Sequence, residues 1–295
     1  MPERLEPVPL PDPALVYDLV AAALAEDGAH RDVTTLALVP PDQQGRGRLL
    51  AKSSGVIAGL PVAAAAFAAM DEEVELVPAV ADGAWVEPMT TIGVVSGPLR
   101  SILSAERVAL NFLQRLSGIA TATRALADAV ADLPVRVLDT RKTTPGLRDL
   151  ERYAVRVGGG YNHRFNLSDG ILIKDNHIAA ARARGLSIAD IVREARRGAP
   201  HTLRVEIEVT RPEEAAAALA AGADVILLDN MGLPEMAEVV AMVKGRALVE
   251  ASGGVTLATV RAIALTGVDL ISAGSITHSA PALDISLEVE AGTSG

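Results

Sequence analysis

The chain of 295 residues contains no cysteine, which excludes disulfide bonds and thiolate metal sites. Aromatic residues make up 2% and the formal net charge is −10, whereas nucleic-acid binding relies on basic surfaces and stacking rings. Long apolar runs are also missing, because Gly55, Gly59 and Pro61 interrupt the longest uncharged stretch, residues 53–70. The first residues are Pro-rich and lack the apolar core of a signal peptide. We therefore expect a cytoplasmic globular protein without nucleic-acid or membrane partners.

Positive charge, scarce overall, is concentrated in residues 141–174. This segment contains seven Lys/Arg residues: Arg141, Lys142, Arg148, Arg152, Arg156, Arg164 and Lys174. Before Asp169, its only acidic residues are Asp149 and Glu151. A cationic segment in an anionic protein indicates an anionic ligand. Three of these arginines, at positions 148, 152 and 156, have the four-residue spacing of a solvated helix face. The other cations stand at the ends of apolar runs, where a solvated helix face explains them less well.

The first part of the chain mixes helices and strands without a regular alternation. Asp12-Pro13 is a typical helix start, and the helix is expected over residues 14–26, followed by a polar loop at 25–35. Further helices are expected at 61–70 and 99–116, with Gly118 as a break and a second helix to about residue 132. Strands are expected within 45–60 and 74–97. This pattern indicates an α+β domain over residues 1–117.

From Pro134 onward, apolar β-branched runs alternate with helical segments. The runs lie at 135–139, 171–173, 203–209, 225–228, 247–249 and 270–272. Strands that alternate with helices predict a parallel sheet, and units of about twenty residues suggest a (β/α) barrel, short of eight strands. A doubly wound open sheet is the alternative, although no GxGxxG follows the first strand.

A polar or glycine-rich element follows each of these runs: Arg141-Lys142, Lys174, Glu208, Asp229, Ser252-Gly253-Gly254 and Gly274-Ser275. In a barrel, the carboxyl ends of the strands meet at one mouth, where such enzymes place their chemistry. The pattern therefore predicts one functional cluster rather than six unrelated loop residues.

The chemistry of these elements indicates a phosphorylated, carboxylated ligand. Small-residue turns that enter helices bind phosphate, and the alternative for each turn alone is an ordinary tight turn. Glu208 and Asp229 are oxygen ligands suited to Mg²⁺, and the alternative for Glu208 is an ordinary ion pair. Glu206 lies on the same face of its strand as Glu208, so the pattern does not choose between them. His163 could be an ordinary loop histidine.

Several segments together resemble the quinolinate phosphoribosyltransferase family over nearly the whole chain. They are LAEDGAHRDVTT, GVIAGLP and ERVALNFLQRLSGIAT in the first domain, then TRKTTPGLR (140–148), GGGYNHRFNLSD (158–169), IKDNHI (173–178), EIEV (206–209), LLDNM (227–231), EASGGV (250–255) and SAGSITHS (272–279). One departure is Arg31, where the family pattern leads us to expect glycine.

The resemblance implies a pentosyltransferase, nicotinate-nucleotide diphosphorylase (carboxylating). Quinolinate and phosphoribosyl pyrophosphate would give nicotinate mononucleotide, pyrophosphate and CO₂ in de novo NAD biosynthesis. The implied fold is an N-terminal α/β sandwich, residues 1–117, followed by an incomplete (β/α) barrel, residues 118–276. The tail, 277–295, would pack back on the first domain. A homodimer is implied, in which one subunit's first domain closes the barrel mouth of the other, with higher oligomers possible.

The resemblance also implies roles for individual residues. Arg141, His163 and Arg164 would hold the two carboxylates of quinolinate, and Arg107 would reach in from the partner subunit. Lys142 and Lys174 would act catalytically on phosphoribosyl pyrophosphate and the reacting groups, while Glu208 and Asp229 would hold ribose hydroxyls and Mg²⁺. The remaining substrate-binding residues implied are Thr140, Ser252, Gly253, Gly254, Ala273, Gly274 and Ser275, with His278 near the pyrophosphate.

Two other activities remain open at this point. One is a paralogue of the same fold that acts on another aromatic acid, although Arg141, His163 and Arg164 provide for a second carboxylate. The other is a barrel aldolase that uses Lys174 as a Schiff-base amine. The aldolase alternative predicts borohydride trapping of a carbonyl substrate on Lys174 and no role for Mg²⁺.

Overall fold

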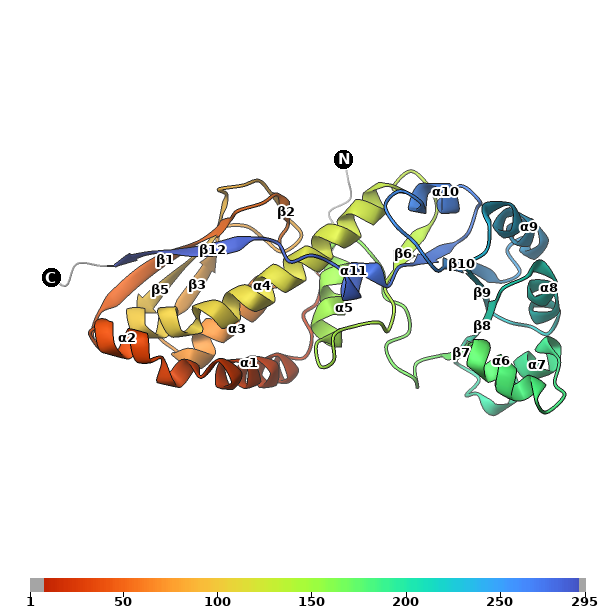
Figure 1. Ribbon diagram of the computed structural model, residues 1–295, viewed down its shortest axis with the longest axis horizontal. Coiled ribbons are helices and arrows are strands. Elements are labelled where there is room, and N and C mark those ends of the chain that lie inside the picture. Colours follow the sequence, from red (N-terminus) through yellow and green to blue (C-terminus); the bar gives the residue numbers. More distant parts are fainter. Residues whose placement is uncertain (1–7, 292–295) are drawn as a thin grey trace. The chain divides into compact units, whose positions relative to one another are not determined.

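The computed structural model describes residues 8–291, and the chain forms two compact units (Figure 1). The first unit contains the residues up to Arg124, Thr144–Gly159 and the residues from Ser279 on, and the second contains Ala125–Thr143 and Gly160–His278. The domain boundary at 117/118 and the tail from 277 stay predictions. Among the described residues, no helix combines the length and apolar character needed to cross a membrane.

A four-stranded antiparallel sheet in the order β12-β1-β5-β3 forms the centre of the first unit. Its helices include α1, α3 and α4, which lie along the sheet in Figure 1, and α1 packs against α3. The elements are α1 (Pro13–Asp27), η1 (Ala29–Arg31), α2 (Val33–Leu38), β1 (Gln44–Ala51), β2 (Gly55–Val56), α3 (Leu60–Met70), β3 (Glu75–Pro78), β4 (Trp85–Val86), β5 (Thr91–Pro98), α4 (Leu99–Asp128), α5 (Arg148–Val157) and β12 (Ile285–Ala291).

The predicted helix start at Asp12-Pro13 is confirmed, since the Asp12 carboxylate accepts a hydrogen bond from the Ala14 amide. The polar loop predicted at 25–35 is wrong. The Asp32 side chain accepts from the amides of Thr34 and Thr35 and thereby caps a further helix, α2. A short polar stretch with a good cap can therefore start a helix that apolar periodicity does not reveal.

The predicted break at Gly118 is also wrong, because α4 continues through it as a single helix of 30 residues. A Cβ at Gly118 would stand 2.0 Å from the carbonyl oxygen of Pro281, so glycine is needed for the close approach of the C-terminal segment. Gln114, one turn earlier, binds the same segment: its side chain donates to the Ile285 carbonyl at 2.6 Å. The glycine marks a packing contact rather than a helix end.

The solvated face predicted for α5 is wrong at Arg152, which is only 2% exposed. Arg148 and Arg156 are half-buried. On the same helix Glu151 is fully buried and pairs with Arg115 of α4 at 2.8 Å. Helix α5 therefore places charged side chains in the interior of the first unit, where buried charges require partners.

Six parallel strands form the sheet of the second unit, in the order β6-β11-β10-β9-β8-β7. Chain neighbours are adjacent from β7 to β11, β6 pairs with β11, and β6 and β7 are left as the two edges. This order confirms an incomplete barrel and excludes the doubly wound alternative. The strands are β6 (Arg136–Leu138), β7 (Ile171–Ile173), β8 (Val205–Val209), β9 (Val225–Asp229), β10 (Leu248–Ser252) and β11 (Leu270–Ser272).

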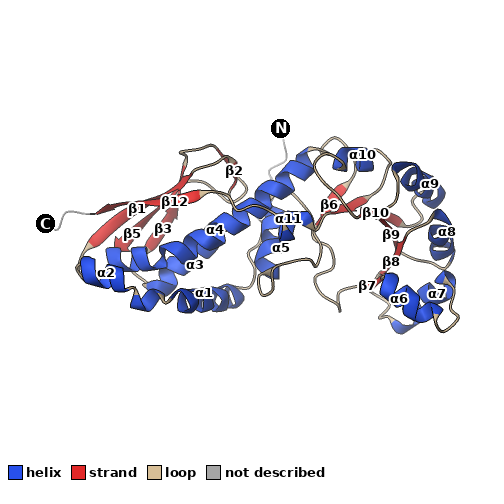
Figure 2. Ribbon diagram, viewed as in Figure 1, coloured by secondary structure: helices blue, strands red, loops and turns tan. Residues whose placement is uncertain are grey.

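Helices α6 to α10 cover the outer side of this curved sheet, as Figure 2 shows by colour, and the short α11 follows β11 elsewhere. They are α6 (Asp175–Arg182), α7 (Ile188–Gly198), α8 (Pro212–Ala220), α9 (Leu233–Val243), α10 (Val260–Ala264) and α11 (Ser275–His278). Ser187 caps α7 through reciprocal hydrogen bonds with Asp190. The turn Ser252–Gly254 was expected to enter a helix directly, but α10 begins only at Val260.

Candidate active site

A cavity of about 260 Å³ lies at the carboxyl ends of the barrel strands, and we call it the mouth cavity. Four cationic side chains and a histidine line it, together with small polar and apolar residues. The lining residues are Thr140, Arg141, Lys142, His163, Arg164, Leu172, Lys174, Leu227, Glu250, Ser252 and Ser272. Seven of the residues predicted for the site therefore meet in this one cavity.

Arg141 and Arg164 are placed to bind an anion here. The Nε of Arg141 is buried and has no hydrogen-bond partner among the described residues. Arg164 donates from Nη1 to the Gly170 carbonyl at 2.8 Å, while burial and the neighbouring Arg141 charge lower the pKa of its guanidinium. Two guanidinium groups held so close repel each other, and an anion between them relieves the repulsion.

Lys142 is held by its own backbone and by the closely packed Gly274. Its amide donates to the Thr140 hydroxyl at 3.1 Å, and its carbonyl accepts from the Thr277 hydroxyl at 2.8 Å. A Cβ on Gly274 would meet the Lys142 Cδ at 3.0 Å and side-chain atoms of Thr140 and His278 at 3.2 Å. The absence of a side chain at Gly274 thus lets Thr140, Lys142 and His278 come together.

Lys174 directly follows β7, Glu208 is the penultimate residue of the neighbouring β8, and Asp229 is the last residue of β9. Lys174 Nζ lies 3.5 Å from Glu208 Oε2. Burial raises the pKa of Glu208, Lys174 lowers it, and the nearby Asp229 charge raises it again. Burial is the largest cause of the net upward shift, and the Asp229 contribution shows that the two carboxylates repel each other, so a cation beside them would relieve the repulsion.

The turn after β10 is pressed against the end of β9. The amide of Asn230 donates to the Ser252 carbonyl at 3.0 Å, and the Asn230 side chain donates to Asp229 Oδ1 at 3.0 Å. Gly253 has φ +93°, and a Cβ there would stand 2.3 Å from the Asn230 amide oxygen. Gly254 follows Gly253 in sequence, and Ala273 and Ser275 come after β11. None of these three residues lines the mouth cavity.

His163 is fixed by the buried carboxylate of Asp139, directly after β6. Asp139 accepts from the His163 amide at 2.8 Å and from the Asn162 side chain at 2.6 Å. The His163 Nδ1 accepts from the Arg164 amide at 2.7 Å. This acceptor role leaves Nε2 as the nitrogen that carries the imidazole proton.

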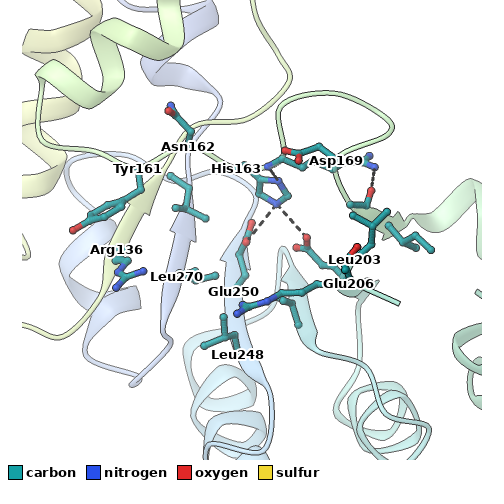
Figure 3. A pocket seen from close by; sticks show the side chains of 17 residues that line it. Arg136, Tyr161, Asn162, His163, Asp169, Leu203, Glu206, Leu248, Glu250 and Leu270 are labelled. Carbon is teal, nitrogen blue, oxygen red and sulfur yellow. Dashed lines mark hydrogen bonds and ion pairs between the residues drawn. The ribbon is translucent and has the colours of Figure 1, made fainter. Parts of the chain in front are cut away.

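The proton on Nε2 faces two buried glutamates on β8 and β10 (Figure 3). Nε2 lies 3.2 Å from Glu206 Oε2 and 3.6 Å from Glu250 Oε2. Burial lowers the pKa of His163, but the hydrogen bond to Glu206 and the charges of Glu250, Glu206 and Asp139 outweigh burial and raise it overall. Burial and the Glu206 charge raise the pKa of Glu250 to about 7.

The potential ligand atoms of His163, Glu206 and Glu250 all lie within 4.8 Å of one another, as a metal site would require. A metal would need the lone pair of Nε2, whereas the Arg164 amide occupies Nδ1 and places the proton on Nε2. The arrangement therefore favours a bound proton between the imidazole and the carboxylates. Glu206 and Glu208 share a strand face but have different surroundings: Glu206 faces His163 and Glu208 faces Lys174.

A second cavity, of about 420 Å³, lies at the amino ends of the same strands, and we call it the lower cavity. Arg136, Tyr161 and Arg204 line it, and the Arg136 guanidinium lies 5.0 Å from the centre of the Tyr161 ring. His163, Arg164 and Glu250 line both cavities. Strand-end reasoning missed Asp139 and Glu250, and the available signal for Glu250 was a charged residue inside an apolar strand, alternating with Ser252.

Arg107 belongs to the first unit, on α4, with its side chain 57% exposed and 3.9 Å from Glu106. Its predicted role in the partner's site remains a prediction.

Two family models together match most of the chain. The model of the quinolinate phosphoribosyl transferase N-terminal domain matches residues 32–117, and that of the C-terminal domain matches residues 119–288.

Curated relatives and solved structures agree with the models. Proteins named probable nicotinate-nucleotide pyrophosphorylase [carboxylating] are 45% identical over 269 residues in Synechocystis sp. and 44% over 264 residues in Bacillus subtilis, each match covering 90% of both chains. The crystal structure of NadC from Streptococcus pyogenes is 43% identical with a TM-score of 0.90, covering 95% of this chain and 98% of the other. The nicotinate-nucleotide pyrophosphorylase from Francisella tularensis has a TM-score of 0.90 at 36% identity, covering 97% of this chain and 100% of its own. The chain belongs to the quinolinate phosphoribosyltransferase family.

Proposed function

We propose that this protein transfers the phosphoribosyl group of phosphoribosyl pyrophosphate to quinolinate. The ring nitrogen attacks C1 of the ribose as pyrophosphate leaves, and the product then loses the 2-carboxylate as CO₂ to give nicotinate mononucleotide. This reaction forms part of NAD biosynthesis, for which a cytoplasmic location is expected. Family membership, together with the composition of the mouth cavity, supports the proposal.

The concentration of cations in the mouth cavity is the observation that carries the proposal. Quinolinate is a dianion, and Arg141, Arg164, Lys142 and Lys174 line the cavity of a chain whose net charge is −10. The unsatisfied, buried Nε of Arg141 supports a carboxylate partner, since buried donors are normally hydrogen-bonded. We assign the two substrate carboxylates to Arg141, Arg164 and the His163 segment.

Charge stabilisation by fixed groups accounts for the first step. A cationic, sugar-like centre develops at C1 while negative charge develops on the leaving pyrophosphate. Lys142 and Lys174 are the cations we assign to phosphoribosyl pyrophosphate and its leaving group, with His278 beside Lys142 as a further contact. Preorganised charges of this kind supply most of the rate enhancement in such transfers, so no covalent nucleophile is required.

Glu208 and Asp229 are the residues we assign to Mg²⁺ and to the ribose hydroxyls. Their mutual repulsion, which contributes to the raised pKa of Glu208, supports a cation between or beside them. When bound, Mg²⁺ would neutralise charge on the pyrophosphate group. The glycine-rich turns at Ser252–Gly254 and Ala273–Ser275, with Thr140, are assigned to the ribose 5-phosphate because bare backbone amides suit phosphate.

The homodimer is also a proposal. In it, Arg107 of one subunit would reach the mouth cavity of the other, and the half-exposed Arg107 side chain is compatible with such a role. A cation supplied across an interface would make activity depend on assembly.

A direct assay tests the proposed function. Purified protein should form nicotinate mononucleotide from quinolinate and phosphoribosyl pyrophosphate in Mg²⁺, and chelation of the metal should stop the reaction. Absence of product from these two substrates, under conditions in which the protein is folded, would overturn the proposal.

A further inference from the structure

Glu250 is the one carboxyl group among the described residues that line the mouth cavity. It projects from the middle of β10 and is 1% exposed. Leu227, its partner on β9, lines the same cavity, as does Ser272 at the end of β11. An ionised carboxylate here would oppose a dianionic substrate, so its protonation state matters to any reaction in the cavity.

The surroundings of Glu250 favour a retained proton. Its Oε1 is buried without a hydrogen-bond partner among the described residues, while its Oε2 lies 3.6 Å from the His163 Nε2. The charged groups that act on it are Glu206, which raises its pKa, and His163 and Lys174, which lower it, and burial is the largest cause of the net rise to about 7. Arg141 and Arg164 line the same cavity. A carboxylic acid with such a pKa can hold and release a proton near neutral pH.

The proposed reaction needs one proton that neither substrate supplies. When the bond between ring C2 and its carboxylate breaks, CO₂ leaves and the electron pair stays on C2, next to the positively charged ring nitrogen. A new C2–H bond must then form. Lysine and arginine side chains hold their protons too tightly at neutral pH to be efficient donors unless strongly perturbed, and the His163 Nε2–H is directed at Glu206 and Glu250.

We propose that Glu250 is the acid that delivers this proton to C2, and that water in the lower cavity replaces it. The Glu250 O–H bond breaks as the C2–H bond forms, which leaves a carboxylate at Glu250. A water molecule from the lower cavity, which Glu250 also lines, then returns a proton to this carboxylate, and the hydroxide leaves to solvent through the same cavity, while the His163 Nε2–H faces the carboxylate throughout. This inference rests on the proposed function and adds to it the source of the product's C2 hydrogen.

The position between two cavities gives this route a physical advantage. The substrates occupy the mouth cavity during the reaction, whereas the lower cavity opens at the opposite end of the strands. A proton can therefore be replaced without passing the bound substrates. Glu206 acts here as a positioning residue that holds the His163 imidazole at 3.2 Å.

The test separates the two chemical steps in the variant Glu250→Gln, which keeps the shape of the side chain. Quinolinate affinity should change by no more than about threefold. The pyrophosphate burst of a single turnover should persist, while nicotinate mononucleotide formation should slow by about 10²–10⁴-fold, the usual contribution of a general acid. N-ribosylated quinolinate that keeps both carboxylates should accumulate.

The pH profile provides the readout that a merely structural role would not change. Wild-type turnover should fall on the alkaline side as Glu250 loses its proton, Glu250→Gln should lack this limb, and Glu250→Asp should restore it in part. Glu238→Gln, on the exposed side of α9, is the matched control and should behave as wild type. Wild-type turnover and an unchanged alkaline limb in Glu250→Gln would overturn the inference, as would loss of quinolinate binding and of the burst together. Failure of the proposed function would show instead in the wild type, which would form neither pyrophosphate nor nucleotide.

Discussion

Replacing Gly118 by alanine should destabilise the protein, although alanine is normally the better helix residue. Gly118 lies inside α4, where glycine costs about 1 kcal/mol relative to alanine, so helix propensity alone predicts a more stable variant. The new Cβ would, however, stand 2.0 Å from the carbonyl oxygen and 2.9 Å from the carbonyl carbon of Pro281. These are backbone atoms, which cannot turn aside as the tip of a side chain can.

The two effects can be compared in free energy. Overpacking a well-packed interior costs typically about 1–3 kcal/mol, and a clash with backbone at this distance belongs at the upper end. Subtracting the gain in helix propensity leaves a net loss of about 2 kcal/mol. For a chain of roughly this size, each kcal/mol of lost stability lowers the melting temperature by about 2–4 °C, so the melting temperature of the variant should fall by about 4–8 °C.

Thermal unfolding followed by circular dichroism measures this difference, and Gly198 supplies the control. Gly198 is the last residue of α7, and a Cβ there would meet nothing within 4 Å. Gly198→Ala should therefore leave the stability unchanged or raise it by about 0.5 kcal/mol. A Gly118→Ala variant that melts at or above the wild-type temperature would refute the packing of the C-terminal segment on α4.

Three further predictions concern the site. Glu208→Gln and Asp229→Asn should each lower turnover by about 10²-fold or more in steady-state kinetics, while circular dichroism should show an intact fold. Full activity in both variants would mean that these carboxylates only form ordinary ion pairs. Arg107→Ala and Arg141→Ala should each be nearly inactive alone. After subunit exchange their mixture should recover about a quarter of wild-type sites, because half of the dimers are mixed and each mixed dimer has one intact site of two. No recovery despite demonstrated exchange would contradict a role for Arg107 across the interface. The folded chain holds a proton on Glu250 up to about pH 7, against an ordinary carboxyl pKa of 4.5, so its stabilising contribution is lost as pH rises between these values. The melting temperature should therefore fall less over this range in Glu250→Gln than in the wild type, and equal slopes would count against the retained proton.

Local sequence signals were sufficient for the parallel sheet and for the mouth cavity. The strands are short, apolar and β-branched, and a polar residue or glycine stands at or just after the end of each, so the alternation and the strand-end positions can be identified without tertiary information. Because parallel strands share one carboxyl edge, the identification of Arg141, Lys174 and Ser252 as strand-end residues already implied that they meet.

Tertiary contacts explain what the sequence could not provide. Nothing near Gly118 indicates that Pro281, more than 160 positions later, needs the space of its missing side chain. The spacing of the α5 arginines shows that they share a face but not that the first unit covers Arg152. Glu250 was missed because attention to strand ends passes over a residue in the middle of β10, and only the sheet brings it to His163.

The measurement that tests the central claim most directly is a count of the products from quinolinate labelled in its 2-carboxylate. Purified protein with phosphoribosyl pyrophosphate and Mg²⁺ should release labelled CO₂, pyrophosphate and nicotinate mononucleotide in equal amounts. Nicotinate, which lacks the 2-carboxylate, should react poorly, because it would leave buried cations such as Arg141 unpaired at a cost of about 1–3 kcal/mol per group or more. Equal rates with quinolinate and nicotinate, or nucleotide formed without CO₂, would contradict the account.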